Sequence, residues 1–242
     1  MKTLLKIFSV LICFSLIPHP AIVKASVQDE LDALRQKFLQ NADPQRANDF
    51  EQGIADVKNS GILESALNTG EQAPNFKLPD ATGTEISLYD LLKDGPVVLV
   101  WYRGGWCPYC NIHLNALQRT LPQIKTAEAS LVAVSPELPD KTLTTKEKHN
   151  LEFYVLSDKG NQVAKSYGIV FTLPDYVLKH YNQFFDIVDY NGDQTHALPL
   201  AAAYVINRQG TVTYTFLDAD YRKRAEPETL LAEVQKLKVT AI

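Results

Sequence analysis

The sequence predicts an α/β domain with a mixed central sheet and helices on both faces, preceded by an N-terminal helical extension. Residues 96–102 form a continuous β-branched and aromatic run, typical of a buried central strand. Shorter apolar runs at 131–134 and 153–156 alternate with segments of helical periodicity, which favours parallel pairing. Near the end, residues 203–206 and 212–216 flank a turn and precede a closing helix at 227–237, which adds an antiparallel pair.

The first 25 residues have the pattern of a signal peptide. Lys2 and Lys6 precede an uncharged apolar run at 7–17, and the segment ends in the small-residue sequence Val23-Lys24-Ala25. The apolar run is too short to span a bilayer, so cleavage after Ala25 and export to the periplasm are expected. A retained membrane anchor is the alternative.

Lipid attachment at Cys13 is disfavoured, because Ile12 stands where such sites carry a small side chain. The formal net charge of the whole chain is −4, and removing residues 1–25 would also remove three lysines. An acidic mature protein argues against nucleic acid and anionic membrane surfaces as partners. No later apolar run approaches spanning length, so no membrane association is expected after cleavage.

The remaining chain divides into a helical extension at 26–69 and the α/β domain at 70–242. The extension shows two helical stretches, 27–39 and 45–58, separated by a break that contains Pro44. The domain is expected to contain the following further elements: a hairpin at 76–88, helices at 111–125, 142–149 and 162–167, and an aromatic insertion at 169–198.

Cys107 and Cys110 are the candidate catalytic residues. They are the two cysteines left outside the predicted signal peptide, at Cys-x-x-Cys spacing where the buried strand meets an amphipathic helix. Free N–H groups at a helix start stabilise a thiolate, and the second thiol can resolve a mixed disulfide or a sulfenic acid. Arg103 could add positive charge, and Pro108 fixes the chain between the thiols in a turn where its missing N–H is not needed.

The same residues allow other interpretations. A zinc site needs four ligands, and Cys107, Cys110 and His113 supply three at most, so no metal is expected. An inert disulfide would close too small a loop to stabilise much. His113 is expected to be a partly exposed surface residue. We interpret residues 189–193 as a plain turn, and residues 220–226 as a solvated charge cluster that could contain an arginine facing the site.

These motifs resemble the peroxiredoxin-like branch of the alkyl hydroperoxide reductase and thiol-specific antioxidant family. The resemblance rests on residues 70–88, on Trp101-Tyr102-Arg103-Gly104-Gly105-Trp106-Cys107-Pro108-Tyr109-Cys110-Asn111, on 171–174 and on 218–227, and spans about 26–237. It implies a thioredoxin-like fold and thiol-based antioxidant activity, with Arg103, Trp106 and Pro108 as supporting residues.

The sequence departs from the family at the peroxide pocket. The family carries Pro-x-x-x-Thr-x-x-Cys, and aligning Cys110 with its reactive cysteine places Arg103 at the proline and Cys107 at the threonine. A family arginine before a later strand, where thioredoxins have a cis-proline, corresponds to Ala201, with Pro199 two residues away. The residues themselves therefore favour a thioredoxin-type dithiol, whereas the resemblance favours hydroperoxide reduction.

The sequence thus predicts a two-cysteine oxidoreductase that cycles between dithiol and disulfide. In a thioredoxin-like mode Cys107 attacks and Cys110 resolves; in a peroxiredoxin-like mode the roles reverse. The expected partners are a small hydroperoxide or a protein disulfide, and a thiol donor such as a thioredoxin-like protein. No cofactor is implied, because no Gly-rich phosphate motif follows a strand. A redox-inactive binding module that uses the aromatic insertion at 169–198 is the alternative of another class.

Overall fold

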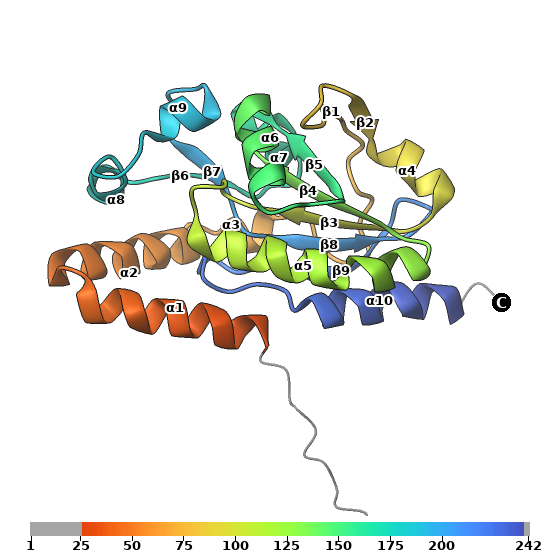
Figure 1. Cartoon of the computed structure of the whole chain (residues 1–242), viewed down its shortest axis with the longest axis horizontal. Coiled ribbons are helices and arrows are strands. Elements are labelled where there is room, and N and C mark those ends of the chain that lie inside the picture. Colours follow the sequence, from red (N-terminus) through yellow and green to blue (C-terminus); the bar gives the residue numbers. More distant parts are fainter. Residues whose placement is uncertain (1–25, 240–242) are drawn as a thin grey trace, which may run out of the picture.

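A five-stranded mixed sheet forms the centre of the molecule in the computed structural model, which describes residues 26–239 (Figure 1). The strand order is β5-β4-β3-β8-β9. Strands β3, β4 and β5 run parallel, whereas β8 is antiparallel to both β3 and β9. The strands are β3 (Val97–Trp101), β4 (Ser130–Ser135), β5 (Tyr154–Ser157), β8 (Ala203–Ile206) and β9 (Val212–Phe216). The predicted mixed sheet is confirmed, and the predicted signal peptide lies outside the described residues.

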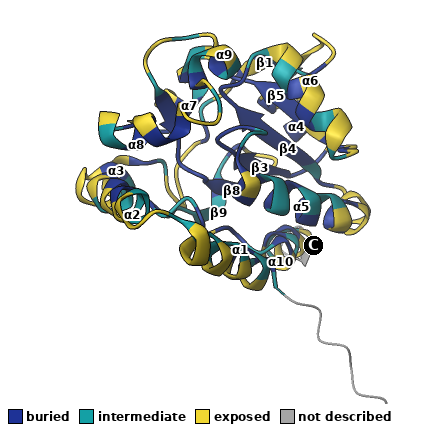
Figure 2. Cartoon of the chain, turned by 60° about the vertical axis from the view of Figure 1, so that its left-hand side comes forward, coloured by how far each residue is buried: buried dark blue, intermediate teal, exposed yellow. Residues whose placement is uncertain are grey.

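Helices cover both faces of this sheet. Alternate β3 side chains point to opposite faces: Val98 and Val100 pack in the core beneath one set of helices, while Val97, Leu99 and Trp101 pack in the other core. The first face is covered by α1 (Val27–Asn41), α5 (Pro108–Thr126) and α10 (Pro227–Val239); the second by α3 (Ile62–Ser65), α4 (Leu88–Asp94) and α7 (Gln162–Ser166). Figure 2 shows the central strands as the most buried part of the chain.

The segment 26–69 folds as the predicted helix, break and helix, followed by the short helix α3, which was not predicted. Ser26 caps α1 in a reciprocal capping box with Asp29, and Asp43 caps α2 (Pro44–Asn59), with Pro44 in its first turn. Helix α1 packs against α5, and α2 packs against α8 (Asp175–Tyr181). Both helices therefore lie on the α/β domain rather than apart from it (Figure 1).

The aromatic insertion is an ordered part of the fold. It contains β6 (Val170–Thr172), α8, α9 (Ile187–Asn191) and β7 (Ala197–Pro199), and β6 pairs antiparallel with β7. The plain turn expected at 189–193 is wrong in part, because α9 continues to Asn191 and Gly192 ends it at a positive φ of 67°. Tyr181 is buried, while Phe184 is 69 % exposed.

The remaining elements show one omission of the sequence-based prediction. The predicted hairpin is confirmed as β1 (Lys77–Pro79) and β2 (Glu85–Ser87), but helix α4 follows it directly and was not predicted. Ser87 caps α4 by accepting the Asp90 N–H, a pattern visible in the sequence. Helix α6 (Pro139–Lys148) and the 3-10 helix η1 (Lys159–Asn161) complete the described chain. No helix within residues 26–239 is long and apolar enough to cross a membrane.

Candidate redox site

The two cysteines lie at the start of α5, just beyond the end of β3. Cys107 is the N-cap and Pro108 is the first helical residue, so the helix begins earlier than the predicted Asn111 and Cys110 lies in its first turn. Gly104 has a φ of 150°, and a Cβ there would lie 2.2 Å from the Trp106 indole nitrogen, so this turn requires glycine. Both cysteines are free thiols, 1 % and 0 % exposed.

Cys110 is surrounded by hydrogen-bond donors. Arg224 Nη2 lies 3.4 Å from its Sγ, and the Arg103 backbone N–H donates to the same atom at 3.5 Å. Burial alone would raise the pKa of Cys110, but the hydrogen bond from Cys107 and the charges of Arg224 and Arg103 outweigh it. Together they hold the pKa of the Cys110 thiol well below its usual range.

Cys107 has the opposite character. Its pKa is raised well above the usual range, first by burial and then by its hydrogen bond to Cys110 and the charge of that thiolate. Cys110 is therefore the thiolate of the pair and Cys107 its neutral hydrogen-bond donor. A helix start favours negative charge in general. The hydrogen bonds that Cys110 accepts from Cys107 and from the Arg103 backbone N–H, together with the nearby charges of Arg224 and Arg103, favour the thiolate on Cys110.

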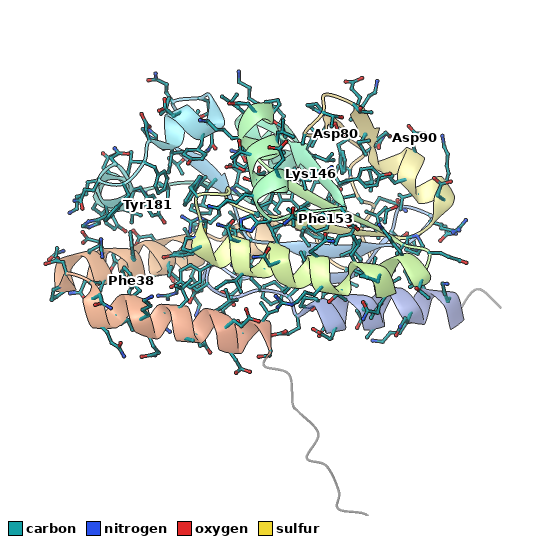
Figure 3. The ribbon with its side chains drawn as sticks, in the orientation of Figure 1. Phe38, Asp80, Asp90, Lys146, Phe153 and Tyr181 are labelled. Atoms are coloured by element: carbon teal, nitrogen blue, oxygen red, sulfur yellow. The ribbon has the colours of Figure 1, made fainter. Side chains whose placement is uncertain are left out.

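The candidate supporting residues occupy different positions. Arg103 is buried, its guanidinium carbon lies 4.1 Å from the Tyr221 ring centroid and 5.0 Å from that of Trp106, and its Nη2 donates to the Tyr181 hydroxyl. Trp106 is half-buried and borders Arg103, whereas Pro108 is exposed. Figure 3 shows Tyr181 in α8, on the same side of the molecule as Phe38 of α1. The aromatic insertion thus contributes to the surroundings of Arg103.

Residues 220–226, here called the arginine loop, correct two interpretations of the sequence. Arg222 and Arg224 are buried and only Lys223 is exposed, so the solvated charge cluster is wrong and Arg224 is the arginine that faces the site. Arg224 Nη1 donates to the carbonyls of Tyr221 and Lys223, which fixes the guanidinium in its own loop.

His113 is buried, not a surface residue as expected, and it bonds to the Ala225 carbonyl with Nε2 at 3.1 Å. Burial and, second, the nearby charge of Arg224 lower the pKa of His113 to about 3, so the imidazole is neutral. Sequence periodicity places His113 on α5 but gives no sign that the arginine loop covers it.

The position at which the family carries an arginine holds no cation here. Ala201 is a buried residue between β7 and β8, and Pro199 pairs with Val170 inside β7. No peptide bond within residues 26–239 is cis, so Pro199 does not take the cis-proline place. Instead, Arg224 brings a positive charge to Cys110 from the segment that follows β9, which has no regular secondary structure.

Two buried donors remain available for a ligand. The Nε–H groups of Arg103 and Arg224 have no acceptor among the described residues, although both side chains are buried. Buried charged donors normally find a partner, so these two groups are candidates to bind an oxygen atom of a substrate.

Glu137 is a further buried acid that the sequence analysis did not single out. It is 0 % exposed, and its Oε1 accepts the Gly105 N–H at 2.9 Å, in the loop just before Cys107. Its Oε2 lies 3.4 Å from the hydroxyls of Ser135 and Thr145. Burial raises the pKa of Glu137 to about 7, although the hydrogen bond from Gly105 opposes the rise.

A pH-dependent stability follows from this carboxyl group. Because the folded pKa lies above the unfolded value of 4.5, the folded chain binds the extra proton between these values and stability falls as pH rises through that window. The free energy of unfolding of the wild-type protein should fall by on the order of 3 kcal/mol between pH 4.5 and 7 because of this group, and Glu137→Gln should remove that fall.

Urea denaturation of both proteins at pH 4.5, 6 and 8 measures this difference. Glu147→Gln, on the exposed face of α6, is the matched control and should keep the wild-type pH profile. Parallel profiles for wild type and Glu137→Gln would contradict a raised pKa of Glu137 in the folded protein.

Comparison with known proteins places the chain in a family. The model of the AhpC/TSA family matches residues 69–215. Peroxiredoxin Q of chloroplasts from Oryza sativa subsp. japonica is 28 % identical over 176 residues, which covers 73 % of this chain and 69 % of the relative. Peroxiredoxin Bcp of Escherichia coli (strain K12) is 33 % identical over 104 residues, 43 % of this chain and 65 % of that protein.

Solved structures agree on the fold. Peroxidoxin BcpB from Mycobacterium tuberculosis superimposes with a TM-score of 0.56 at 23 % identity, covering 71 % of this chain and 98 % of that one. The fold is thioredoxin-like, as expected, and the matched family spans more than half of the sequence. The chain therefore belongs to the AhpC/TSA family and is a peroxiredoxin-like, thiol-based oxidoreductase.

Proposed function

We propose that this protein reduces hydroperoxides, with Cys110 as the attacking thiolate and Cys107 as the resolving thiol. The observation that carries the proposal is the charge distribution at the dithiol: the low pKa belongs to Cys110, beside Arg224 and Arg103. This is the peroxiredoxin-like order of the two roles, not the thioredoxin-like order that the residues alone favoured.

The proposed catalytic cycle needs no redox group other than the two cysteine sulfurs and an external dithiol. The Cys110 thiolate attacks a peroxide oxygen, the S–O bond forms as the O–O bond breaks, and the leaving alkoxide takes up a proton and departs as an alcohol. Cys107 then loses its proton and attacks the Cys110 sulfenic sulfur, forming the disulfide and releasing water. An external dithiol, such as a thioredoxin-like protein, reduces the disulfide and completes the cycle.

The free donors fit the first step. Negative charge develops on the leaving oxygen as the O–O bond breaks, and fixed donors aimed at such an oxygen lower the barrier. The unpartnered Nε–H groups of Arg103 and Arg224 are suited to that role.

Exchange with protein disulfides is the second candidate, and the structure favours it less. In a thioredoxin-like mode the helix-entry sulfur must reach a disulfide on another protein, yet Cys107 is 1 % exposed and has a raised pKa. A small hydroperoxide needs far less access than a protein surface does.

Stopped-flow measurement of the reduced wild-type protein with hydrogen peroxide and an organic hydroperoxide tests the proposal. A second-order rate constant far above that of a free thiol is expected, together with slow reduction of a disulfide-bonded model protein. A peroxide rate close to that of a free thiol, with rapid protein-disulfide exchange, would instead establish the second candidate.

We also propose that the chain is exported through residues 1–25. The composition of that segment supports export, and Ser26, the residue after the expected cleavage site, is the N-cap of α1. Sequencing the N-terminus of protein isolated from the periplasm should give Ser26. Recovery of the uncleaved chain from the cytoplasm would refute export.

A further inference from the structure

The arginine loop has to be held in place for Arg224 to reach Cys110. The loop lies between β9 and α10 and has no regular secondary structure of its own. It carries Tyr221 over Arg103 and Arg224 against Cys110. Its anchors therefore affect the redox site even where they do not touch a sulfur.

Helix α2 of the extension supplies one anchor. The Glu51 carboxylate binds Arg222 through both oxygens, with Nη1–Oε1 at 2.6 Å and Nη2–Oε2 at 3.0 Å. Arg222 is buried and also pairs with Asp220 inside the loop, with Nε–Oδ1 at 2.7 Å. Such a planar two-point contact fixes direction as well as distance. Glu51 thus ties the loop to α2 two residues before Arg224.

Helix α1 supplies a second anchor. The Glu226 carboxylate accepts the N–H groups of Val27 and Gln28 at 3.0 and 2.9 Å, so it satisfies free donors at the start of α1. Helices α1 and α2 therefore both hold the loop, at Glu226 and Arg222 on either side of Arg224 in the sequence.

We propose that Glu51 is a positioning residue of the redox site, which acts through Arg222 to hold Arg224 against Cys110. The N-terminal helical extension is then a working part of the site, although it lies outside the matched family region. This inference rests on the proposed role of Cys110, and it adds a residue and a segment that the dithiol chemistry alone does not require.

The direction in which the pKa of Cys110 changes in Glu51→Gln distinguishes a positioning role of Glu51 from a direct effect of its charge. A carboxylate acting on Cys110 through space disfavours the thiolate, so removing that charge would lower the thiol pKa. Loss of positioning moves Arg224 away from the sulfur, so the same substitution would raise the thiol pKa. Glu51→Gln therefore distinguishes the two by direction.

The experiment uses the full chain with Cys13→Ser and Cys107→Ser, which leaves Cys110 as the single thiol. The rate of iodoacetamide alkylation against pH gives the pKa of Cys110, and stopped flow gives its rate with hydrogen peroxide. Glu51→Gln should raise the pKa and slow the peroxide reaction roughly fivefold, the factor expected for a partly exposed ion pair of ~1 kcal/mol.

Glu30→Gln is the matched control. Glu30 lies on α1 of the same extension and pairs with Arg119 of α5 at 3.0 Å; within residues 26–239 its side chain makes no hydrogen bond or ion pair with the arginine loop. Glu30→Gln should leave both the pKa of Cys110 and its rate of reaction with hydrogen peroxide unchanged. Arg222→Lys, which keeps the charge but loses the two-point contact, should reproduce the Glu51→Gln shift, and the double variant should add little to either.

An unchanged or lowered Cys110 pKa in Glu51→Gln would overturn the positioning role, even if the variant is less stable to heat. Failure of the proposed function would look different, because the parent protein itself would then react with peroxide no faster than a free thiol.

Discussion

Cys110→Ser should lose all reaction with hydroperoxide, whereas Cys107→Ser should retain the first step. The first substitution removes the thiolate that Arg224 and Arg103 stabilise. The second leaves it in place and removes only the thiol that resolves the sulfenic acid. Single-turnover stopped flow measures the first step, and a sulfenic-acid reagent followed by mass spectrometry identifies the oxidised sulfur.

The two variants separate further under turnover. With an external dithiol, Cys107→Ser should stop or slow after one equivalent of peroxide, because its sulfenic acid has no partner in the chain. Some loss of the first-step rate in Cys107→Ser is consistent with the account, since Cys107 also donates a hydrogen bond to Cys110. Sulfenic acid on Cys107 in the Cys110→Ser protein, formed at the wild-type rate, would reverse the two roles.

Arg224→Gln should produce the second-largest effect. A hydrogen bond to a charged group contributes about 2 kcal/mol, so its loss should slow the peroxide reaction about 30-fold and raise the pKa of the Cys110 thiol. Arg224→Lys keeps the charge but loses the second donor of the fork, and it should fall between wild type and Arg224→Gln.

Lys223→Gln is the control for net charge. Lys223 directly precedes Arg224 in the arginine loop; it is exposed, and its Nζ lies 3.5 Å from Asp218 Oδ2. Its substitution therefore removes one positive charge without changing a side chain that contacts the thiols. It should react at the wild-type rate. Equal slowing in Lys223→Gln and Arg224→Gln would mean that general surface charge, rather than the 3.4 Å contact with sulfur, sets the reactivity.

Local sequence patterns predicted the strand and the helix that position the two cysteines. The buried run at 97–101, the Cys-x-x-Cys pair and the amphipathic helix after it place a dithiol at a strand-to-helix turn, and the structure has that arrangement. These features depend on neighbours in sequence, for which periodicity and capping rules are informative.

Long-range contacts explain what the sequence missed. Arg224 and Cys110 are 114 residues apart, and Glu51 and Arg222 are 171 apart. A run of charged residues at 220–226 has the composition of an exposed surface, but in the fold Arg222 and Arg224 are buried and contact Glu51 and Cys110. Glu137 was missed for the same reason, because nothing local shows that its carboxylate faces the Gly105 N–H.

The account depends on which sulfur bears the charge, and the thiol pKa values of the reduced protein test this most directly. Alkylation against pH, followed by mass spectrometry of the two labelled positions, measures each sulfur separately. We expect Cys110 to react as a thiolate well below the pH at which an ordinary cysteine does, while Cys107 stays protonated at that pH. A thiolate at Cys107, or two thiols that titrate like those of an unfolded peptide, would contradict the mechanism.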